Sequence, residues 1–343
     1  MKNTNKFFII LSLIILLLIL FIKTQNLTYI ENLNFEHPDF LYIYPKYNFT
    51  INKKNKELIH HKKNTIKYKD LNSKKSREIM LNKNKSSEYL FKNGIPTPKS
   101  IKYLKGDNNI KQTIKLVEKQ LSFPLVVKPV NETKGKGVHL DISNAIELQN
   151  VIKKLISKYD ELIIEEQIDG NTYRILIVNN KIIDIILRPL PFIIGDGNKT
   201  LQKLLDKRNK NQLKNNNYPI YNVNYNFIKK QGFKLNSIIP KNKKVYVTNI
   251  ANYHNGSNPV IIPIEKVHPD NIKMFLQVNK VLGANISGID YISKDISKSY
   301  KKQGAVIEVN SGPSYKMHDI LHPKYKISND IISQLDKYYN TIF

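Results

Sequence analysis

The chain has 343 residues, 41% apolar, 24% charged and 10% aromatic, with no cysteine and a formal net charge of +27. This much apolar material excludes a wholly disordered chain, and the lack of cysteine excludes a disulfide-stapled module, a thiolate zinc site and a cysteine nucleophile. The charge suits a polyanion binder, but nearly all basic residues are lysines spread along an asparagine- and isoleucine-rich chain, so we favour a diffuse solvated surface and expect no specific nucleic acid.

The N-terminus carries an apolar run from Phe7 to Ile22, interrupted only by Ser12 and flanked by Lys6 and Lys23. The run is slightly shorter than the roughly 17–25 residues of a spanning helix, but flanking lysines can reach the headgroups. A cleaved signal peptide is the alternative, although no small-x-small cleavage site follows. The sequence predicts a single-pass transmembrane anchor over residues 1–23, in contact with the lipid bilayer through residues 7–22. Its orientation is left open.

Residues 24–75 are rich in Tyr, Asn and Lys without clear periodicity, and we interpret them as a spacer or reduced accessory region. A main domain is predicted over residues 76–340. Its predicted helices are Met80–Asn93, Asn144–Tyr159, Thr200–Arg208 and Asp270–Leu282, followed by a helical C-terminus. Its predicted strands are Phe123–Pro129, Leu162–Ile168, Tyr173–Val178, Ile182–Arg188, Gly288–Ile292 and Ala305–Asn310.

Two features refine this prediction. Asn179-Asn180 separates two strands and tolerates positive φ, which indicates a hairpin. The asparagine-rich stretch 211–226 is expected to be a loop. Strands and helices mix without a regular βαβ order, which favours an α+β (mixed α/β) fold over a Rossmann or TIM fold.

Three oxygen-bearing side chains suggest a metal site. Glu308 and Asn310 alternate on one predicted strand and therefore point to one face, and Asp290 lies in another strand. Two carboxylates and an amide oxygen suit Mg²⁺ that bridges nucleotide phosphates. The alternative is a solvated polar strand face.

A glycine-containing segment, Lys134-Gly135-Lys136-Gly137, follows the strand that holds Lys128. Glycines let the backbone and its amide hydrogens approach phosphates closely. It is not a Walker A loop, because no Gly-Lys-Ser/Thr follows. A surface hairpin is the alternative.

Two further pairs of residues have a functional and a structural interpretation. Glu165-Glu166 could read adenine through one carboxylate and the backbone, or could lie on a charged edge strand. Arg174 and Arg188 lie on opposite strands of the hairpin, where they could clamp phosphoryl or carboxylate oxygens or simply be exposed. Because nearly all other basic residues of this chain are lysines, an arginine indicates a position that needs the planar guanidinium group. Besides these two, the sequence contains only Arg77 and Arg208.

Singly these patterns are weak, and their order along the chain is the stronger signal. The segments FPLVVKPVNETKGKGV, IIEEQIDGNTYRILIVNNKI, GIDYISKDI and IEVNSGPSYKMH occur in succession. In this order the sequence resembles the ATP-grasp superfamily over about residues 76–325. Within it, the sequence looks most like the ATP-grasp domain of cyanophycin synthetase and the related glutathione-synthetase domain of bifunctional enzymes. The resemblance implies two α+β subdomains that clamp a nucleotide.

The resemblance also implies roles for individual residues. The phosphate-binding residues would be Lys83 and Lys128, under a mobile loop over Lys134–Gly137. The adenine hinge would be Glu165, Glu166 and Ile168. The catalytic residues would be Lys128, Arg174 and Arg188, and the metal ligands Asp290, Glu308 and Asn310. The substrate pocket would include Asn252, Lys316 and His318.

The sequence departs from the family pattern at several positions. Thr172 stands where the family has an acidic residue for the ribose, for which Asp169 could substitute. Glu132 stands where the loop usually has a glycine, and Gly256-Ser257 replaces a Gly-Gly pair. The segment Ser311–Ser314 also varies, so the substrate is not carried over. Cyanophycin synthesis as a whole is not expected.

The resemblance implies an ATP-dependent carboxylate–amine ligase that forms an amide through an acyl phosphate, with an amino acid or short peptide as substrate. The cofactors would be ATP and Mg²⁺, with two ions expected and Mn²⁺ as an alternative. The catalytic domain would face the cytosol, and a homodimer is left open. The alternatives are a membrane-tethered ATP-binding protein without ligase activity and a basic, membrane-anchored polyanion binder.

Overall fold

The computed structural model describes residues 49–52, 57–60, 65–67, 72–106, 110–132, 135–215, 221–314, 316–322 and 327–342. The predicted anchor lies outside these residues and stays a prediction. Among the described helices, none is both long and apolar enough to cross a bilayer.

The chain forms two compact units, one of residues 72–313 and one of residues 1–71 together with 314–343. The second unit contains a three-stranded antiparallel sheet in the order β1 (Phe49–Asn52), β2 (Glu57–His60), β3 (Thr65–Lys67). It also contains α10 (Lys316–Leu321) and α11 (Ile327–Ile342). The domain boundaries expected at residues 23 and 75 remain predictions.

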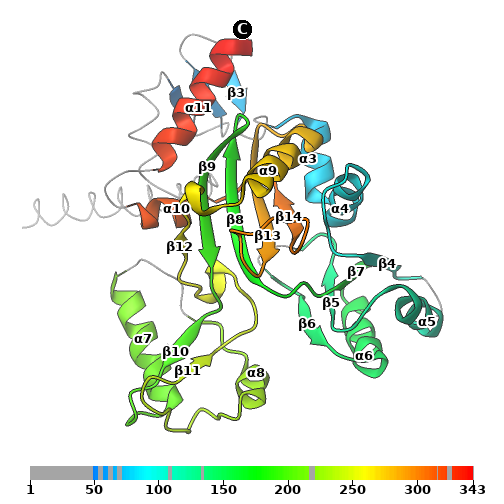
Figure 1. The fold of residues 1–343 in the computed structure, drawn as a ribbon, viewed down its shortest axis with the longest axis vertical. Helices are drawn as coiled ribbons and strands as arrows, with labels where there is room; N and C mark the ends of the chain where they lie inside the picture. The colour runs from blue at the N-terminus through cyan, green and yellow to red at the C-terminus, as the bar shows by residue number, and fades with distance from the viewer. Residues whose placement is uncertain are drawn as a thin grey trace, which may run out of the picture. The chain divides into compact units, whose positions relative to one another are not determined.

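The unit of residues 72–313 has three lobes, each with its own hydrophobic cluster. The five-stranded lobe has an antiparallel sheet in the order β12-β9-β8-β13-β14. Its strands are β8 (Asn171–Val178), β9 (Lys181–Arg188), β12 (Val260–Ile261), β13 (Ile286–Ser293) and β14 (Ala305–Asn310). Its helices are α3 (Lys74–Leu81), α4 (Lys83–Lys92) and α9 (Pro269–Leu282). Helix α9 lies against the sheet (Figure 1), and Phe275 packs edge-on to Tyr291 at 5.2 Å between ring centroids.

The four-stranded lobe, residues 100–166, has an antiparallel sheet in the order β4-β7-β5-β6. Its strands are β4 (Ser100–Leu104), β5 (Leu125–Pro129), β6 (His139–Ile142) and β7 (Glu161–Glu166). Helices α5 (Ile110–Gln120) and α6 (Ala145–Ile156) supply Val117, Leu148 and Ile152 to a buried cluster with Leu125 and Ile164.

The ribbon lobe, residues 192–247, is built on two short antiparallel strands, β10 (Phe192–Ile194) and β11 (Lys244–Tyr246). Helices α7 (Leu201–Asn215) and α8 (Tyr225–Lys230) pack against one face of this ribbon, where Ile193, Val245, Leu201 and Ile228 are buried together. Two 3₁₀ turns, Tyr253–Asn255 and Ile264–Lys266, follow the lobe along the chain.

Local sequence explains several element boundaries. Asn179 and Asn180 have φ of 47° and 55°, so the predicted hairpin is confirmed. Helix α9 begins at Pro269 after a His268 cap and ends at Gly283, whose φ is 59°. The helix predicted over Met80–Asn93 is wrong as one element, because the Asn82 side chain accepts from Lys85 N and starts a second helix. Part of the predicted asparagine-rich loop is helical, since α7 continues to Asn215.

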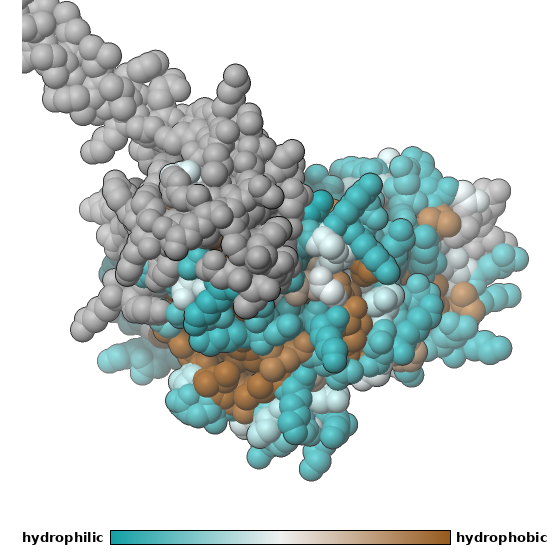
Figure 2. All heavy atoms as spheres, turned by 90° about the horizontal axis from the view of Figure 1, so that it is seen from above, coloured by the Kyte–Doolittle hydropathy of each residue, from teal (hydrophilic) through white to brown (hydrophobic). Residues whose placement is uncertain are grey.

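Hydrophilic side chains cover much of the described surface in the view of Figure 2, around an apolar area. Eleven large apolar side chains among the described residues are exposed, including Leu81, Phe91 and Ile146. The mixed α/β fold class predicted from the sequence is confirmed by the sheets and helices of the larger unit.

Candidate functional site

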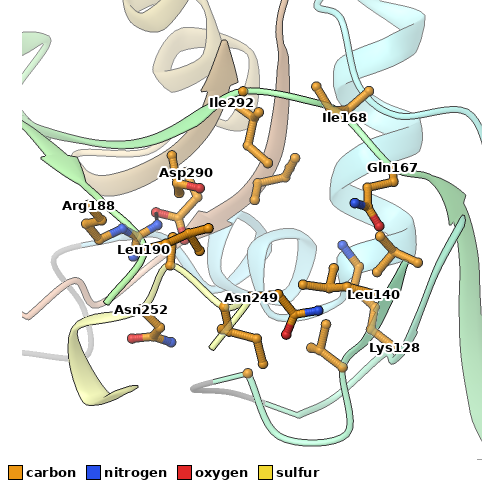
Figure 3. Close-up of a pocket in the computed structure, with 18 of the residues that line it drawn as sticks. Lys128, Leu140, Gln167, Ile168, Arg188, Leu190, Asn249, Asn252, Asp290 and Ile292 are labelled. Atoms are coloured by element: carbon orange, nitrogen blue, oxygen red, sulfur yellow. Dashed lines mark ion pairs between the residues drawn. The ribbon is translucent and has the colours of Figure 1, made fainter. Parts of the chain in front are cut away.

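A cavity of about 570 Å³ is lined by residues of all three lobes of the larger unit. This volume is in the range of small-molecule sites. In Figure 3, Arg188 and Asp290 face each other at one side of the cavity, and Lys128 and Gln167 lie at the opposite side. The chemistry of the cavity is therefore set by at least two groups of charged and polar residues.

The first group centres on Asp290 in β13. In the sheet register, Asp290 lies opposite Arg174 of β8 on one side and Glu308 of β14 on the other. Arg174 donates from Nε to Asp290 Oδ1 at 2.6 Å and from Nη2 to Oδ2 at 3.2 Å, and Arg188 Nη2 lies 2.7 Å from Oδ1. Two charge-assisted contacts from fixed forks hold this carboxylate in one orientation. Gly288 leaves room for the Arg174 guanidinium, since a Cβ at this position would lie 2.7 Å from Arg174 Nη1.

Burial and charge oppose each other at this carboxylate. Only 8% of the Asp290 side chain and 6% of the Arg188 side chain are exposed. Burial alone would raise the pKa of Asp290, but the two guanidinium groups bring its pKa below the ordinary value. Burial lowers the pKa of Arg188, against the opposing effect of Asp290. The carboxylate is therefore held ionised.

The residues predicted as metal ligands only partly converge. Asp290 and Glu308 both line the cavity, whereas Asn310 does not and donates from Nδ2 to Gly288 O at 3.4 Å. Among the described residues, no three His, Cys, Asp or Glu side chains cluster as a metal site. The oxygen donors still fit Mg²⁺: the contacts of Asp290 use three of about four acceptor positions, and Asn310 lies two positions from Glu308 along β14.

The second group lies in the four-stranded lobe. Lys128 of β5 and Glu165 of β7 form a largely buried ion pair with 2.6 Å between Nζ and Oε1. Glu166 accepts from Ser122 N at 2.9 Å, and Ile168 lines the cavity just beyond the strand. The structure thus brings together the predicted phosphate lysine and the predicted adenine hinge.

The glycine loop lies between these groups. Lys83 of α4 donates to Glu132 O at 2.6 Å and lies 3.3 Å from Glu308 Oε1. Glu132 Oε1 pairs with Lys136 Nζ at 2.9 Å, and this hydrogen bond raises the pKa of Lys136. A Cβ at Gly137 would meet Pro129 Cγ at 2.8 Å, so this position of the loop requires glycine. The predicted loop residue Lys134 lies outside the described residues.

Sequence reasoning missed a polar bridge between the four-stranded lobe and the segment after the ribbon lobe. Asp141, whose φ is 59°, accepts from Gln167 Nε2 at 2.8 Å through Oδ1 and from Asn249 Nδ2 at 2.7 Å through Oδ2. All three line the cavity. No motif surrounds Asp141, and its partners are 26 and 108 positions away. Only the unusual φ identifies it, and that is a structural observation.

The remaining predicted residues are placed as follows. Asn252 lines the cavity, whereas Arg174 does not and pairs with Asp290. Lys316 and His318 belong to the other compact unit. Thr172 and Asp169 both line the cavity, and Asp169 Oδ2 lies 3.3 Å from Lys294 Nζ.

The cavity wall is acidic in a strongly basic chain. Among the described residues it contains seven carboxylates and five cations. Four of the cations are already paired with carboxylates of the wall: Lys83 with Glu308, Lys128 with Glu165, Lys136 with Glu132, and Arg188 with Asp290. Such a wall suits an anion that arrives together with a divalent cation better than a bare polyanion.

Comparison with known proteins shows what the chain is similar to. The family model described as D-ala D-ala ligase C-terminus matches residues 90–191. A cyanophycin synthetase of Synechocystis sp. is 29% identical over 254 residues, which are 70% of this chain and 28% of that protein. The glutathione biosynthesis bifunctional protein GshAB of Clostridium perfringens is 26% identical over 256 residues, 70% of this chain and 32% of that protein. The chain thus spans about a third or less of these relatives' length.

A comparison of the fold with solved structures agrees with the sequence matches. The crystal structure of a bifunctional glutathione synthetase from Pasteurella multocida superimposes with a TM-score of 0.53 at 18% identity, over 82% of this chain and 38% of that one. The mixed α/β architecture of the larger unit is therefore an ATP-grasp-like fold. The resemblance predicted from the order of the sequence segments is confirmed: the chain is similar in sequence to cyanophycin synthetase and to the bifunctional glutathione-biosynthesis protein, and its fold is ATP-grasp-like.

Proposed function

We propose that this chain is an ATP-dependent carboxylate–amine ligase that acts on an amino acid or a short peptide. The observation that carries the proposal is the wall of the cavity, where Asp290 and Glu308 lie opposite each other on β13 and β14 beside Arg188 and Lys83, with Lys128 across the cavity. The matching family model is described as a ligase and the Synechocystis relative as a synthetase, which supports the same reaction class.

The proposed reaction has two steps. A substrate carboxylate oxygen attacks the γ-phosphorus of ATP, the bond to the β-phosphate oxygen breaks, and an acyl phosphate and ADP form. The amine of the second substrate then attacks the acyl carbon, phosphate leaves, and the amine proton is lost to solvent as the amide forms. No nucleophilic side chain is required, so positioning and charge stabilisation supply the catalysis.

The cations of the cavity would bind the transferring phosphoryl group. Lys83 is paired with Glu308, and Lys128 with Glu165. When either lysine binds a phosphate, the phosphate would replace the carboxylate as its anionic partner. Arg188 is fixed by Asp290 and presents its guanidinium with little loss of side-chain entropy. When bound, Mg²⁺ would neutralise phosphate charge, with Asp290 and Glu308 as its ligands and Asn310 as a further oxygen donor.

Water must be kept from the acyl phosphate, because hydrolysis would waste it. The glycine loop is held at Lys83 through Glu132 O, and a Cβ at Gly135 would lie 3.6 Å from Ile250. Of the described residues here, Glu132 thus contacts α4, and Gly135 lies near the segment that follows the ribbon lobe. We propose that the loop covers the reacting groups during turnover.

The test follows phosphate release from Mg-ATP by the full chain, in detergent, with pools of amino acids and dipeptides. We expect substrate-dependent release that Glu308→Ala reduces by a factor of about 100 or more, because a proposed ligand of the Mg²⁺ that would neutralise the transferring group is lost. The matched control is Glu265→Ala, which removes an exposed carboxylate outside the cavity. ATP binding without release in any pool would favour the alternative, a nucleotide-binding protein without ligase activity. Normal release by folded Glu308→Ala would refute the metal assignment.

A further inference from the structure

Lys244 differs from the other cations of the cavity wall. Lys83, Lys128, Lys136 and Arg188 each pair with a carboxylate of the wall. Lys244 also lines the cavity, and no carboxylate in the described part of the chain pairs with it. An anion that binds one of the other four must share that cation with a carboxylate or displace it, whereas an anion at Lys244 competes with no carboxylate of the described residues.

The ribbon of β10 and β11 directs Lys244 toward the cavity. Side chains alternate along a strand, so Ile193 and Val245 point into the buried cluster of the ribbon lobe. The opposite face carries Phe192, Lys244 and Tyr246, and all three line the cavity. The register pairs Phe192 with Tyr246, which places Lys244 diagonally across from the Phe192 ring.

Neighbouring rings and hydrogen bonds hold this face in place. The Lys244 ammonium lies 4.2 Å from the Phe192 ring centroid and 6.0 Å from that of Tyr246, within cation–π range. The Tyr246 backbone is bound on both sides by the Gln231 amide, at 2.8 and 3.0 Å. Tyr221 Oη donates to Phe192 O at 2.8 Å. Aromatic faces hold the ammonium but accept hydrogen bonds weakly, so its three donors still favour a charged acceptor.

We propose that Lys244, with Phe192 and Tyr246 beside it, forms a subsite for an anionic group of a ligand in this cavity. The anionic group is a carboxylate or a phosphate. It would belong either to the nucleotide or to a substrate that carries a carboxylate besides the one being activated. The subsite deepens the proposed function. Only the choice between these two ligands rests on that function; the anion site itself does not.

The experiment measures binding to the full chain by calorimetry, with pairs of probes that differ in the anionic group. One arm compares Mg-ATP with adenosine. The other compares L-glutamate with L-glutamine and L-aspartate with L-asparagine, in the presence of Mg-ADP. The variants are Lys244→Met and Lys244→Arg. The control is Lys243→Met, which removes an exposed ammonium next to β11 that does not line the cavity.

We expect wild type to prefer the anionic member in at least one arm, and Lys244→Met to reduce that preference by a factor of about 10 or more, as for loss of a charge-assisted hydrogen bond. Lys244→Arg should retain most of it, and Lys243→Met all of it. A loss confined to the nucleotide arm assigns the phosphates, and a loss confined to the amino-acid arm assigns a substrate carboxylate.

Three results would overturn the subsite: no anionic preference in wild type in either arm, a preference that Lys244→Met leaves unchanged, or an equal loss in Lys243→Met. The failure of the ligase proposal looks different. In that case no pool would release phosphate, while the anionic preference that depends on Lys244 would persist in whichever arm showed it.

Discussion

Asp290 is the residue on which the charged part of the site depends. It pairs with two guanidinium groups at once, and its side chain and that of Arg188 are nearly inaccessible to solvent. Asp290→Asn would leave two buried cations facing a neutral amide. Because removing one partner of a buried ion pair leaves an uncompensated charge, we expect the free energy of unfolding to fall by about 3–5 kcal/mol. Urea denaturation of the purified variant measures this loss.

An exposed ion pair provides the control for that prediction. Asp160 and Lys105 pair at 3.3 Å, but 89% and 56% of their side chains are exposed. Asp160→Asn should therefore cost at most about 1 kcal/mol. Equal losses in the two variants would show that Asp290 and the arginines do not form a desolvated cluster.

The scarcity of arginine was an informative residue-level signal. Arg174 and Arg188 hold Asp290, and Arg208 stacks on Tyr221 at 3.5 Å while it donates to Gly256 O and Asn258 Oδ1. The sequence could predict that these positions need a planar fork. It could not predict that the partner of the hairpin arginines is Asp290, because that contact joins residues 116 positions apart through strand pairing.

At the scale of the element, strand β6 carries a pH-sensitive group. His139 lies opposite Val127 of β5, and burial, followed by the charge of Lys154, lowers the pKa of its ring. The folded state thus keeps His139 neutral at a pH where the unfolded chain already binds a proton. Stability from this group is complete above the ordinary pKa of about 6.5 and is lost as pH falls below it.

We therefore expect the free energy of unfolding of wild type to fall between about pH 7.5 and 5.5 by more than that of His139→Gln. Urea titrations of both proteins at the two pH values measure the difference. A pH dependence that is the same in both proteins would contradict the assignment to His139.

Elements with a strong local signal were predictable, and elements that depend on distant pairing were not. The predicted strand Ala305–Asn310 has the bounds of β14, and the hairpin of β8 and β9 follows from its Asn-Asn turn. Strands β10 and β11 have three residues each and pair across about 50 residues of intervening chain. Neither shows enough alternation to be recognised alone. The whole ribbon lobe, and Lys244 with it, was therefore missing from the sequence-based prediction of the site.

At the scale of the molecule, the net charge and the charge of the cavity have opposite signs. The chain carries +27, yet the described cavity wall has more carboxylates than cations. The excess lysines therefore lie elsewhere, and the space-filling view shows a largely hydrophilic described surface around an apolar area (Figure 2). This separation matters for the choice between a ligase and a polyanion binder, because the two functions would use different charges.

Salt distinguishes these two uses of charge. Scattered surface lysines release counterions when they bind a polyanion, so raising NaCl from about 50 to about 200 mM should weaken binding of a DNA duplex by a factor of about 1,000 or more if several phosphates are contacted. Three of the four ion pairs of the cavity wall, all except Lys136–Glu132, are mostly buried and therefore less screened. We therefore expect substrate-dependent phosphate release to change by less than about threefold over the same range. Parallel measurement of release and of DNA binding by fluorescence anisotropy makes the comparison. If the two fell together, the surface lysines would have to take part in turnover, and the cavity alone would not account for the activity.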